Sequence, residues 1–211
     1  MRIVLTAVDD PLAAWERHCG HLPGVGVHRG SILNLSLDAV VSPANSFGFM
    51  DGGNDPLYSQ HFGWGMQGRL QELIADRHHG ELLVGAAEIV ATGSAIIPFC
   101  IAAPTMRVPM ILRDIVNPYL AARAALLLIK HGIIPAGTCA GVPVADAVQS
   151  VGFPGLGTGV GQVGPEVCAH QVRRAIEEVV LGQGEYPRTW AEAQMSHQRL
   201  YTDRPRNLQR D

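Results

Sequence analysis

The chain has 211 residues, a length typical of one domain or of one domain with an appendage. Hydrophobic residues make up 47% and charged residues 17%, which excludes a disordered chain, because disorder needs low hydrophobicity and high net charge. The net charge of -3 gives no sign of the basic domain that is typical of nucleic-acid binding.

Four cysteines are scattered along the chain without any C-x-x-C spacing, which argues against a zinc knuckle or a redox pair: Cys19, Cys100, Cys139 and Cys168. We expect each to be a buried, reduced thiol in a cytoplasmic protein. The apolar run at the amino terminus is short for a signal peptide, and no stretch reaches the roughly 18 apolar residues of a membrane span. The sequence therefore predicts no membrane partner.

Strands and helices alternate in the predicted order. Apolar, β-rich runs predict strands at residues 3–8, 25–28, 38–42, 87–91, 95–102 and 147–153. Apolar periodicity and capping residues predict helices at about 11–18, 65–77, 119–130 and 165–181. In the third of these helices, Asn117 is the predicted N-cap, Pro118 the first helical residue and Gly132 part of the carboxyl end.

This alternation predicts an α/β domain over residues 1–182, with a mostly parallel sheet and helices on both faces. Residues 182–187 read as a linker. The C-terminal extension, residues 183–211, should contain a short helix at about 190–200 and a frayed end. Parallel sheets of this kind bind ligands beyond the carboxyl ends of their strands.

Two glycine-rich loops follow predicted strands and should meet at that edge. The second loop, residues 154–161 (PGLGTGVG), leaves backbone N–H groups uncovered and leads into a helix N-terminus, where the dipole favours an anion. Phosphate or diphosphate is the natural ligand; a tight turn between strand and helix is the alternative.

The sequence contains only a weak match to the known nucleotide-binding motifs. Gly159, Gly161 and Gly164 match G-x-G-x-x-G, but the match is weak because no predicted strand follows the helix. The GxxxxGK[ST] motif of P-loop proteins is absent from the sequence. A metal-binding pattern and the G-x-S-x-G turn of serine hydrolases are absent as well.

The first loop, residues 42–56 (SPANSFGFMDGGNDP), carries polar side chains suited to a sugar ligand. The amide of Asn45 can bind hydroxyls, and the carboxylate of Asp55 can position water or hold a ribose hydroxyl. Alternatively, Asn45 braces its own loop and Asp55 caps the next helix ahead of Pro56. His61 can serve as a general base if it reaches this edge, or else faces solvent.

Three segments together resemble the macro domain family. DAVVSPANSFGFMDGGNDP resembles the first ligand loop, which begins with a V-N-A-A-N-type motif, and FPGLGTGVG resembles the second, F-P-x-x-S-T-G-x-x-G. His28-Arg29-Gly30-Ser31-Ile32 lies where the family has G-D-I. The resemblance covers residues 3–181. The form S-P-A-N-S-F-G, at the start of the first loop, resembles a divergent branch of the macro domain family.

The resemblance implies a three-layer α/β/α fold with a mixed, mostly parallel sheet that binds ADP-ribose without a cofactor or metal. It implies catalytic roles for Asn45 at the distal ribose and for Asp55 in activating water. The ligand-binding residues that it implies are Ser31, Ile32, Ala44, Asn45, Gly52, Gly53, Asn54, Gly155, Leu156, Gly157, Thr158, Gly159, Val160 and Gly161.

The sequence departs from the family at three positions. Ser31 replaces the acidic residue that contacts adenine, and Gly161 replaces an aromatic residue that packs on the distal ribose, a role that Phe47 or Phe49 can take. Asp51 lies where a glycine is common.

Three functions remain open at this point. One is a hydrolase of ADP-ribose derivatives: an ADP-ribosyl hydrolase, an O-acetyl-ADP-ribose deacetylase or an ADP-ribose 1''-phosphatase. Another is a module that binds ADP-ribose or an ADP-ribosylated substrate without chemistry. The third is an oligomeric scaffold with a vestigial site, although the sequence does not give the oligomeric state.

Overall fold

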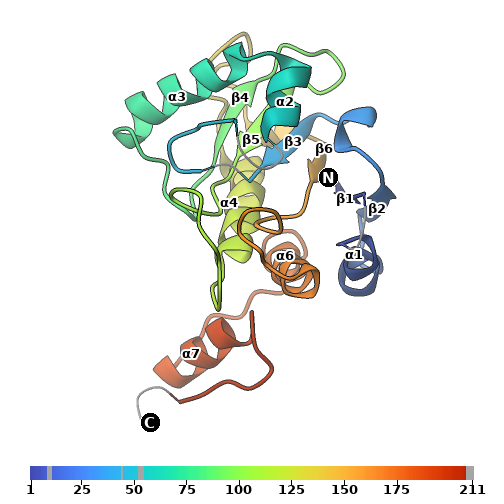
Figure 1. The fold of residues 1–211 in the computed structure, drawn as a ribbon, viewed down its shortest axis with the longest axis vertical. Coiled ribbons are helices and arrows are strands. Elements are labelled where there is room, and N and C mark those ends of the chain that lie inside the picture. Colours follow the sequence, from blue (N-terminus) through green and yellow to red (C-terminus); the bar gives the residue numbers. More distant parts are fainter. Residues whose placement is uncertain (9–10, 44, 52–54, 208–211) are drawn as a thin grey trace.

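A computed structural model of the protein describes residues 1–8, 11–43, 45–51 and 55–207, without the side chain of Asp55. The strands are β1 (Arg2–Ala7), β2 (Val25–Arg29), β3 (Ala39–Ser42), β4 (Glu88–Ala91), β5 (Phe99–Ala102) and β6 (Ser150–Phe153). They form one sheet in the order β2-β1-β6-β3-β5-β4 (Figure 1). All neighbouring strands are parallel except β4 and β5, which confirms the predicted mixed, mostly parallel sheet.

The helices lie between the strands in the predicted alternation. They are α1 (Pro11–Cys19), the 3₁₀ helix η1 (Ile32–Asn34), α2 (Asp55–Phe62), α3 (Gly65–His78), α4 (Asn117–His131), α5 (Val144–Ala147), α6 (Pro165–Val179) and α7 (Trp190–Gln198). The short helix α5 was not predicted, whereas a helix at α2 was expected only in the alternative in which Asp55 caps a helix ahead of Pro56. Among the described residues, no helix combines the length and the apolar character needed to cross a bilayer.

Two hydrophobic cores cover the two faces of the sheet. Val41 of β3 belongs to the core shared with α1, α4 and α6, whereas its neighbour Val40 belongs to the core shared with α2 and α3. Successive residues of a strand point to opposite faces, so a strand buried on both sides needs apolar residues throughout. The four residues of β3 are all buried, and the fold is the predicted three-layer α/β/α arrangement.

The sheet topology places the two glycine-rich loops next to each other. β6 and β3 are adjacent, with Val151 opposite Ala39 and Gly152 opposite Val40. Because the two strands are parallel, their carboxyl ends, Phe153 and Ser42, lie at the same edge of the sheet. The loops at residues 43–51 and 154–164 therefore both begin there, as predicted.

Two predicted strands are shorter in the structure. The strand predicted at 147–153 begins only at Ser150, because the preceding residues form α5 and Val148 N–H donates to the carbonyl of Val144. The strand predicted at 95–102 begins at Phe99, because Ser94 Oγ accepts hydrogen bonds from the N–H groups of Ile96 and Ile97 and holds them in a turn.

Asn117 was wrongly predicted as the N-cap of α4. The N-cap is Val116, and the helix begins at Asn117. The Asn117 side chain instead donates to the carbonyl oxygen of Thr105 at 2.7 Å, so it fastens the segment that follows β5 to the start of α4. Gly132 ends the helix as predicted.

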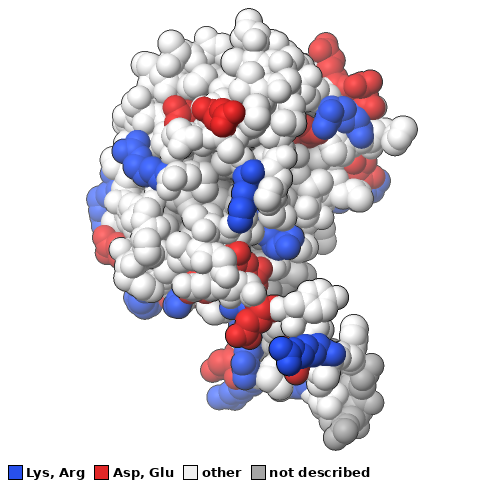
Figure 2. Space-filling model, turned by 180° about the vertical axis from the view of Figure 1, so that it is seen from behind, with Lys and Arg blue, Asp and Glu red and all other residues white. Residues whose placement is uncertain are grey.

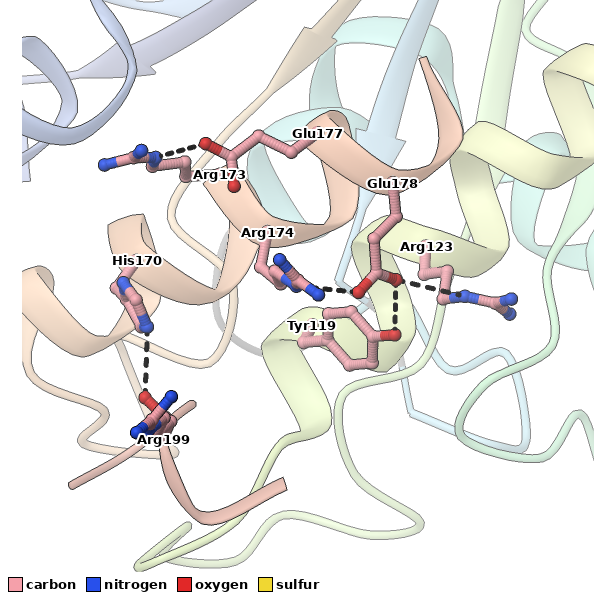
Figure 3. A network of polar contacts seen from close by, with 8 residues as sticks. All are labelled: Tyr119, Arg123, His170, Arg173, Arg174, Glu177, Glu178 and Arg199. Carbon is pink, nitrogen blue, oxygen red and sulfur yellow. Dashed lines mark hydrogen bonds and ion pairs between the residues drawn. The ribbon is translucent and has the colours of Figure 1, made fainter. Parts of the chain in front are cut away.

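A polar network joins α4 to α6 (Figure 3). The carboxylate of Glu178 accepts from the hydroxyl of Tyr119 at 2.7 Å and from Nε of Arg174 at 2.8 Å, and Arg123 lies 3.8 Å away. Burial, together with the hydrogen bond to Glu178, raises the pKa of Tyr119 to about 12. Tyr119 therefore remains a hydrogen-bond donor at neutral pH.

The C-terminal extension packs against α6. His170 Nε2 donates to the carbonyl oxygen of Arg199 at 3.1 Å, and the buried Gln171 donates to that of Leu200 at 3.2 Å. Burial lowers the pKa of His170, which favours the neutral ring that makes this contact. Figure 1 shows α7 beyond the end of α6, away from the sheet.

We predict that Asp38→Ala weakens the pairing of β3 with β6. Asp38 Oδ2 accepts hydrogen bonds from Gln149 N–H at 3.0 Å and from Ser150 N–H and Oγ at 2.8 Å each. Hydrogen bonds to a charged group contribute about 1.5–3 kcal/mol, so the free energy of unfolding in urea should fall by about 2 kcal/mol. Ser150→Ala removes one of these three donors and also the acceptor of Asp38 N–H at 3.0 Å, and it leaves the carboxylate bound to two backbone N–H groups, so it should cost less. An equal or larger loss in this control would contradict the assignment.

Candidate functional site

The second loop folds back on itself through its carbonyl groups. The Gly157 carbonyl accepts from Val163 N–H at 3.1 Å, that of Gly159 from Gln162 N–H at 3.0 Å, and that of Gly161 from Leu112 N–H at 2.8 Å. Within the described part of the chain, no amide from residue 157 to residue 161 donates a hydrogen bond to a protein acceptor. This run of free donors lies just before α6, whose N-terminus adds a favourable field for an anion.

Two of the loop glycines are required by the backbone. Gly157 has φ +70°, a conformation that residues with a Cβ rarely adopt. A Cβ on Gly161 would lie 2.5 Å from the carbonyl oxygen of Gly157 and 2.9 Å from Cδ1 of Leu112. Gly159 differs, because a Cβ there would meet no atom within 4 Å.

Leu156 anchors the base of the second loop. Its side chain is fully buried, and its N–H donates to Cys168 Sγ at 3.3 Å, so this amide is already engaged. Burial raises the pKa of the Cys168 thiol to about 12, which keeps it neutral beside the loop. Cys19 and Cys100 are also buried, as predicted, whereas Cys139 is only partly buried. Thr158 is partly buried and Val160 is exposed.

The first loop is organised around Asn45. Its side-chain oxygen accepts from the N–H groups of Phe47 at 3.0 Å and Phe49 at 3.3 Å, and its side-chain nitrogen donates to the carbonyl oxygen of Phe49 at 2.7 Å. Asn45 therefore braces its own loop, which was the alternative to direct ligand binding. Asn45 also pairs with Met106 in an isolated parallel bridge, which ties the loop to the segment after β5.

Arg107 covers Phe47 and fixes this part of the first loop. Its guanidinium carbon lies 5.2 Å from the centre of the Phe47 ring, and its nitrogens lie 2.6 and 3.2 Å from the carboxylate of Glu81. The ion pair raises the pKa of Arg107 and lowers that of Glu81. Ser46 N–H donates to the carbonyl of Arg107 in turn. No motif in the sequence predicts this contact.

Several predicted site residues lie outside the described part of the chain: Ala44, Gly52, Gly53 and Asn54. Asp55 is the first residue of α2, and its side chain is outside the described part as well. His61 of α2 and Asp51 are exposed.

Ser31 and Ile32 have structural partners after β2. Ser31 is the N-cap of η1, where its Oγ accepts from Leu33 N–H at 3.3 Å. The buried Ile32 lies against the sheet, because a Cβ on Gly152 would be 2.6 Å from its Cδ1. Both residues follow a strand that ends at the same edge as β6 and β3.

The charged side chains on one side of the molecule are mixed in sign. On the side shown in Figure 2, blue and red side chains are interspersed, without a broad basic patch among the described residues. The described residues also contain no group of three His, Cys, Asp or Glu side chains placed to hold a metal ion. The free amides of the second loop are donors that can bind an anion at this edge of the sheet.

Comparison with known sequences identifies two relatives. No protein-family model matches the chain. An uncharacterized protein of Aquifex aeolicus is 30% identical over 155 residues, which cover 74% of this chain and 80% of that protein. An uncharacterized protein of Aeropyrum pernix is 30% identical over 164 residues, covering 78% and 75%. The chain belongs to one family with these two proteins.

Comparison with solved structures identifies the fold. The macrodomain of Mycobacterium tuberculosis DarG aligns with a TM-score of 0.56 at 18% identity, covering 72% of this chain and 88% of that one. An Oceanobacillus iheyensis macrodomain variant with ADPR aligns at 0.56 and 20%, covering 71% and 74%. A Trypanosoma brucei macrodomain in complex with ADP-ribose aligns at 0.52 and 21%, covering 80% and 62%.

We predict that two neighbouring glycines respond differently to substitution by alanine. Gly161→Ala should lower the free energy of unfolding by about 2 kcal/mol, because its Cβ meets a backbone carbonyl that cannot easily move. Gly159→Ala, in open space, should change it by less than about 0.5 kcal/mol. Chemical denaturation of both variants checks this. Equal stability of the two would mean that the loop does not fold back as described.

Proposed function

We propose that this chain, which has the macrodomain fold, binds ADP-ribose through its second loop and hydrolyses a bond at the distal ribose. The observation that carries the proposal is the run of free amides at residues 157–161 before α6. Backbone N–H groups at a helix N-terminus bind phosphate oxygens without needing a cationic side chain. A diphosphate offers enough acceptor oxygens to satisfy several of these donors at once.

Structures of the same fold support the choice of ligand. The Oceanobacillus iheyensis and Trypanosoma brucei macrodomains named above were solved with ADPR and with ADP-ribose, respectively. In this chain, the first loop begins beside the second loop, because β3 neighbours β6. A ribose linked to a diphosphate at residues 157–161 would thus lie within reach of the first loop.

The hydrolytic step is assigned to Asp55, with Asn45 as a positioning residue. In this mechanism, the Asp55 carboxylate accepts a proton from a water molecule as the water oxygen forms a bond to the distal ribose or to a group attached to it. The bond to the leaving group breaks, and the leaving group takes up a proton. Asn45 shapes the loop that leads to Asp55 through its three hydrogen bonds to Phe47 and Phe49. The reaction is of the ADP-ribosyl hydrolase, O-acetyl-ADP-ribose deacetylase or ADP-ribose 1''-phosphatase type.

A specific observation favours a second candidate, a module that binds ADP-ribose without chemistry. The side chains of Asn45 and Ser31 already make hydrogen bonds within their own segments. Fewer free polar groups would then be available to orient the ligand, and catalysis depends on orientation more steeply than binding does.

Isothermal titration with ADP-ribose tests ligand binding. We predict that the wild-type chain binds ADP-ribose and that Gly159→Glu weakens binding by more than about tenfold, because the new carboxylate lies beside the diphosphate. Gly159→Gln has nearly the same size without the charge and should weaken binding far less. Gly159 leaves space for both side chains. Equal affinities of the two variants would contradict binding of an anion at this loop.

Turnover of ADP-ribose derivatives tests the catalytic assignment. We predict that Asp55→Asn lowers the hydrolysis rate by about 10²-fold or more while the affinity for ADP-ribose stays within about threefold, because the amide cannot accept the proton. The measurement is single-turnover hydrolysis over a panel of ADP-ribosylated peptides, O-acetyl-ADP-ribose and ADP-ribose 1''-phosphate. Binding without turnover by the wild-type chain would establish the second candidate instead.

A further inference from the structure

The segment that follows β5 connects the two loops of the candidate site. At one end of this segment, the carbonyl of Arg107 accepts a hydrogen bond from Ser46 N–H of the first loop at 3.2 Å. At the other end, Leu112 N–H donates to the carbonyl of Gly161 in the second loop at 2.8 Å. These six residues, the bridging segment (107–112), therefore run from the first loop to the second.

The middle of the bridging segment is apolar and exposed. Three of its side chains have exposed fractions between 45% and 49%: Val108, Met110 and Ile111. In the second loop, Val160 is 49% exposed as well. Ile111 precedes Leu112 and Val160 precedes Gly161, so both side chains adjoin the hydrogen bond that joins the segment to the loop. The apolar surface thus continues from the bridging segment into the second loop.

This grouping of exposed apolar residues lies next to the proposed anion site. Isolated apolar residues are common on protein surfaces and need no explanation. Here they follow one another in the bridging segment and continue at Val160, within the run of free amides at residues 157–161. Both ends of the segment are hydrogen-bonded to a loop, so little conformational entropy is lost when a partner covers it. Clustered apolar residues of this kind are typical of a surface that binds a partner.

The chemistry of this surface favours a polypeptide over a nucleic acid. Residues 108–111 carry no charge, and the next charged residues, Arg113 and Asp114, are opposite in sign. Arg107 is already paired with Glu81. A nucleic acid requires cations for its phosphates, whereas the centre of a protein interface is poor in charge and enriched in side chains such as methionine.

We infer that the bridging segment selects acceptor polypeptides with apolar side chains next to the residue that carries the ADP-ribosyl group. The inference rests on the proposed binding of ADP-ribose and holds for a hydrolase and for a binding module alike. A diphosphate at residues 157–161 tethers the acceptor close to the bridging segment, because Leu112 binds Gly161. The tether raises the effective concentration of the acceptor there, so a few apolar contacts suffice to distinguish one acceptor from another.

The test compares free ADP-ribose with two ADP-ribosylated peptides by isothermal titration. Both peptides carry ADP-ribose on a central cysteine through a stable S-glycosidic bond; leucine and valine flank the cysteine in one, and serine and glycine in the other. The wild-type chain should bind the apolar peptide about tenfold more tightly than the polar peptide. Met110→Ser combined with Ile111→Ser should abolish this preference and change the affinity for free ADP-ribose by less than about twofold.

Two further variants serve as controls. Met110→Leu combined with Ile111→Val keeps the surface apolar and should retain the preference. Ile96→Ser removes an apolar side chain that is 62% exposed between β4 and β5. Because β5 is parallel to β3, the residues before it lie at the opposite edge of the sheet, so this change should alter neither the affinities nor the preference.

The outcomes separate this inference from the proposed function. If the wild-type chain binds none of the three ligands, the proposed function fails and the inference fails with it. If free ADP-ribose binds but the two peptides bind equally, or the serine variant keeps the preference, ADP-ribose binding stands and the role of the bridging segment is overturned. A uniform loss of affinity for all three ligands in the serine variant also overturns it, because the segment would then only support the loops. Tighter binding of an ADP-ribosylated oligonucleotide than of the apolar peptide overturns the choice of a polypeptide.

Discussion

The arrangement of this edge depends on the parallel pairing of β3 with β6. Both strands are central and short, and the carboxylate of Asp38 binds the start of β6 through Gln149 and Ser150. Gly152 of β6 leaves room for the side chains of Ile32 and Leu37, whose Cδ1 atoms would lie 2.6 and 2.7 Å from a Cβ at this position. The absence of one side chain thus brings the segment after β2 onto the strand that leads into the second loop. Three segments that begin at one edge are in this way positioned by a single pair of strands.

The anion site proposed at the second loop, which consists of backbone donors, also requires that nearby negative charge be neutralised. Glu166 lies in the first turn of α6, close in sequence to the free amides, where an unpaired carboxylate would compete with a bound phosphate. Its two oxygens are instead bound by Arg17 at 2.6 Å and His18 at 2.9 Å, both from α1. Cys168, two residues further along, stays a neutral thiol because burial raises its pKa. The first turn of α6 therefore keeps the positive end of its dipole available to the second loop.

Sequence reasoning correctly predicted the three layers of the fold and the edge of the sheet at which the two loops begin, because both follow from local signals. Apolar runs without alternation, such as DAVVS, indicate strands buried on both faces, and the two loops follow such strands. It erred where a distant partner decides the local structure. Asn117 has the sequence context of an N-cap. Its side chain instead donates a hydrogen bond to the carbonyl of Thr105, which lies near Asn117 only in the folded chain. The late start of β6 follows instead from the short helix α5 before it, and Asp38, more than a hundred residues earlier, binds the first residue of the strand. The pairing of Arg107 with Phe47 and Glu81 had no local signal at all.

The two loops at this edge of the sheet are ordered by different means. The second loop is ordered through its carbonyl groups: those of Gly157, Gly159 and Gly161 accept hydrogen bonds, so the amides remain free. In the first loop one side chain, Asn45, satisfies backbone groups of Phe47 and Phe49, so the Phe49 ring remains exposed. Free backbone amides can bind an anion, which is the part of the proposed function that the second loop serves. The hydrogen bonds of Asn45 within the first loop give that residue a structural reason to occupy its position even without touching a ligand.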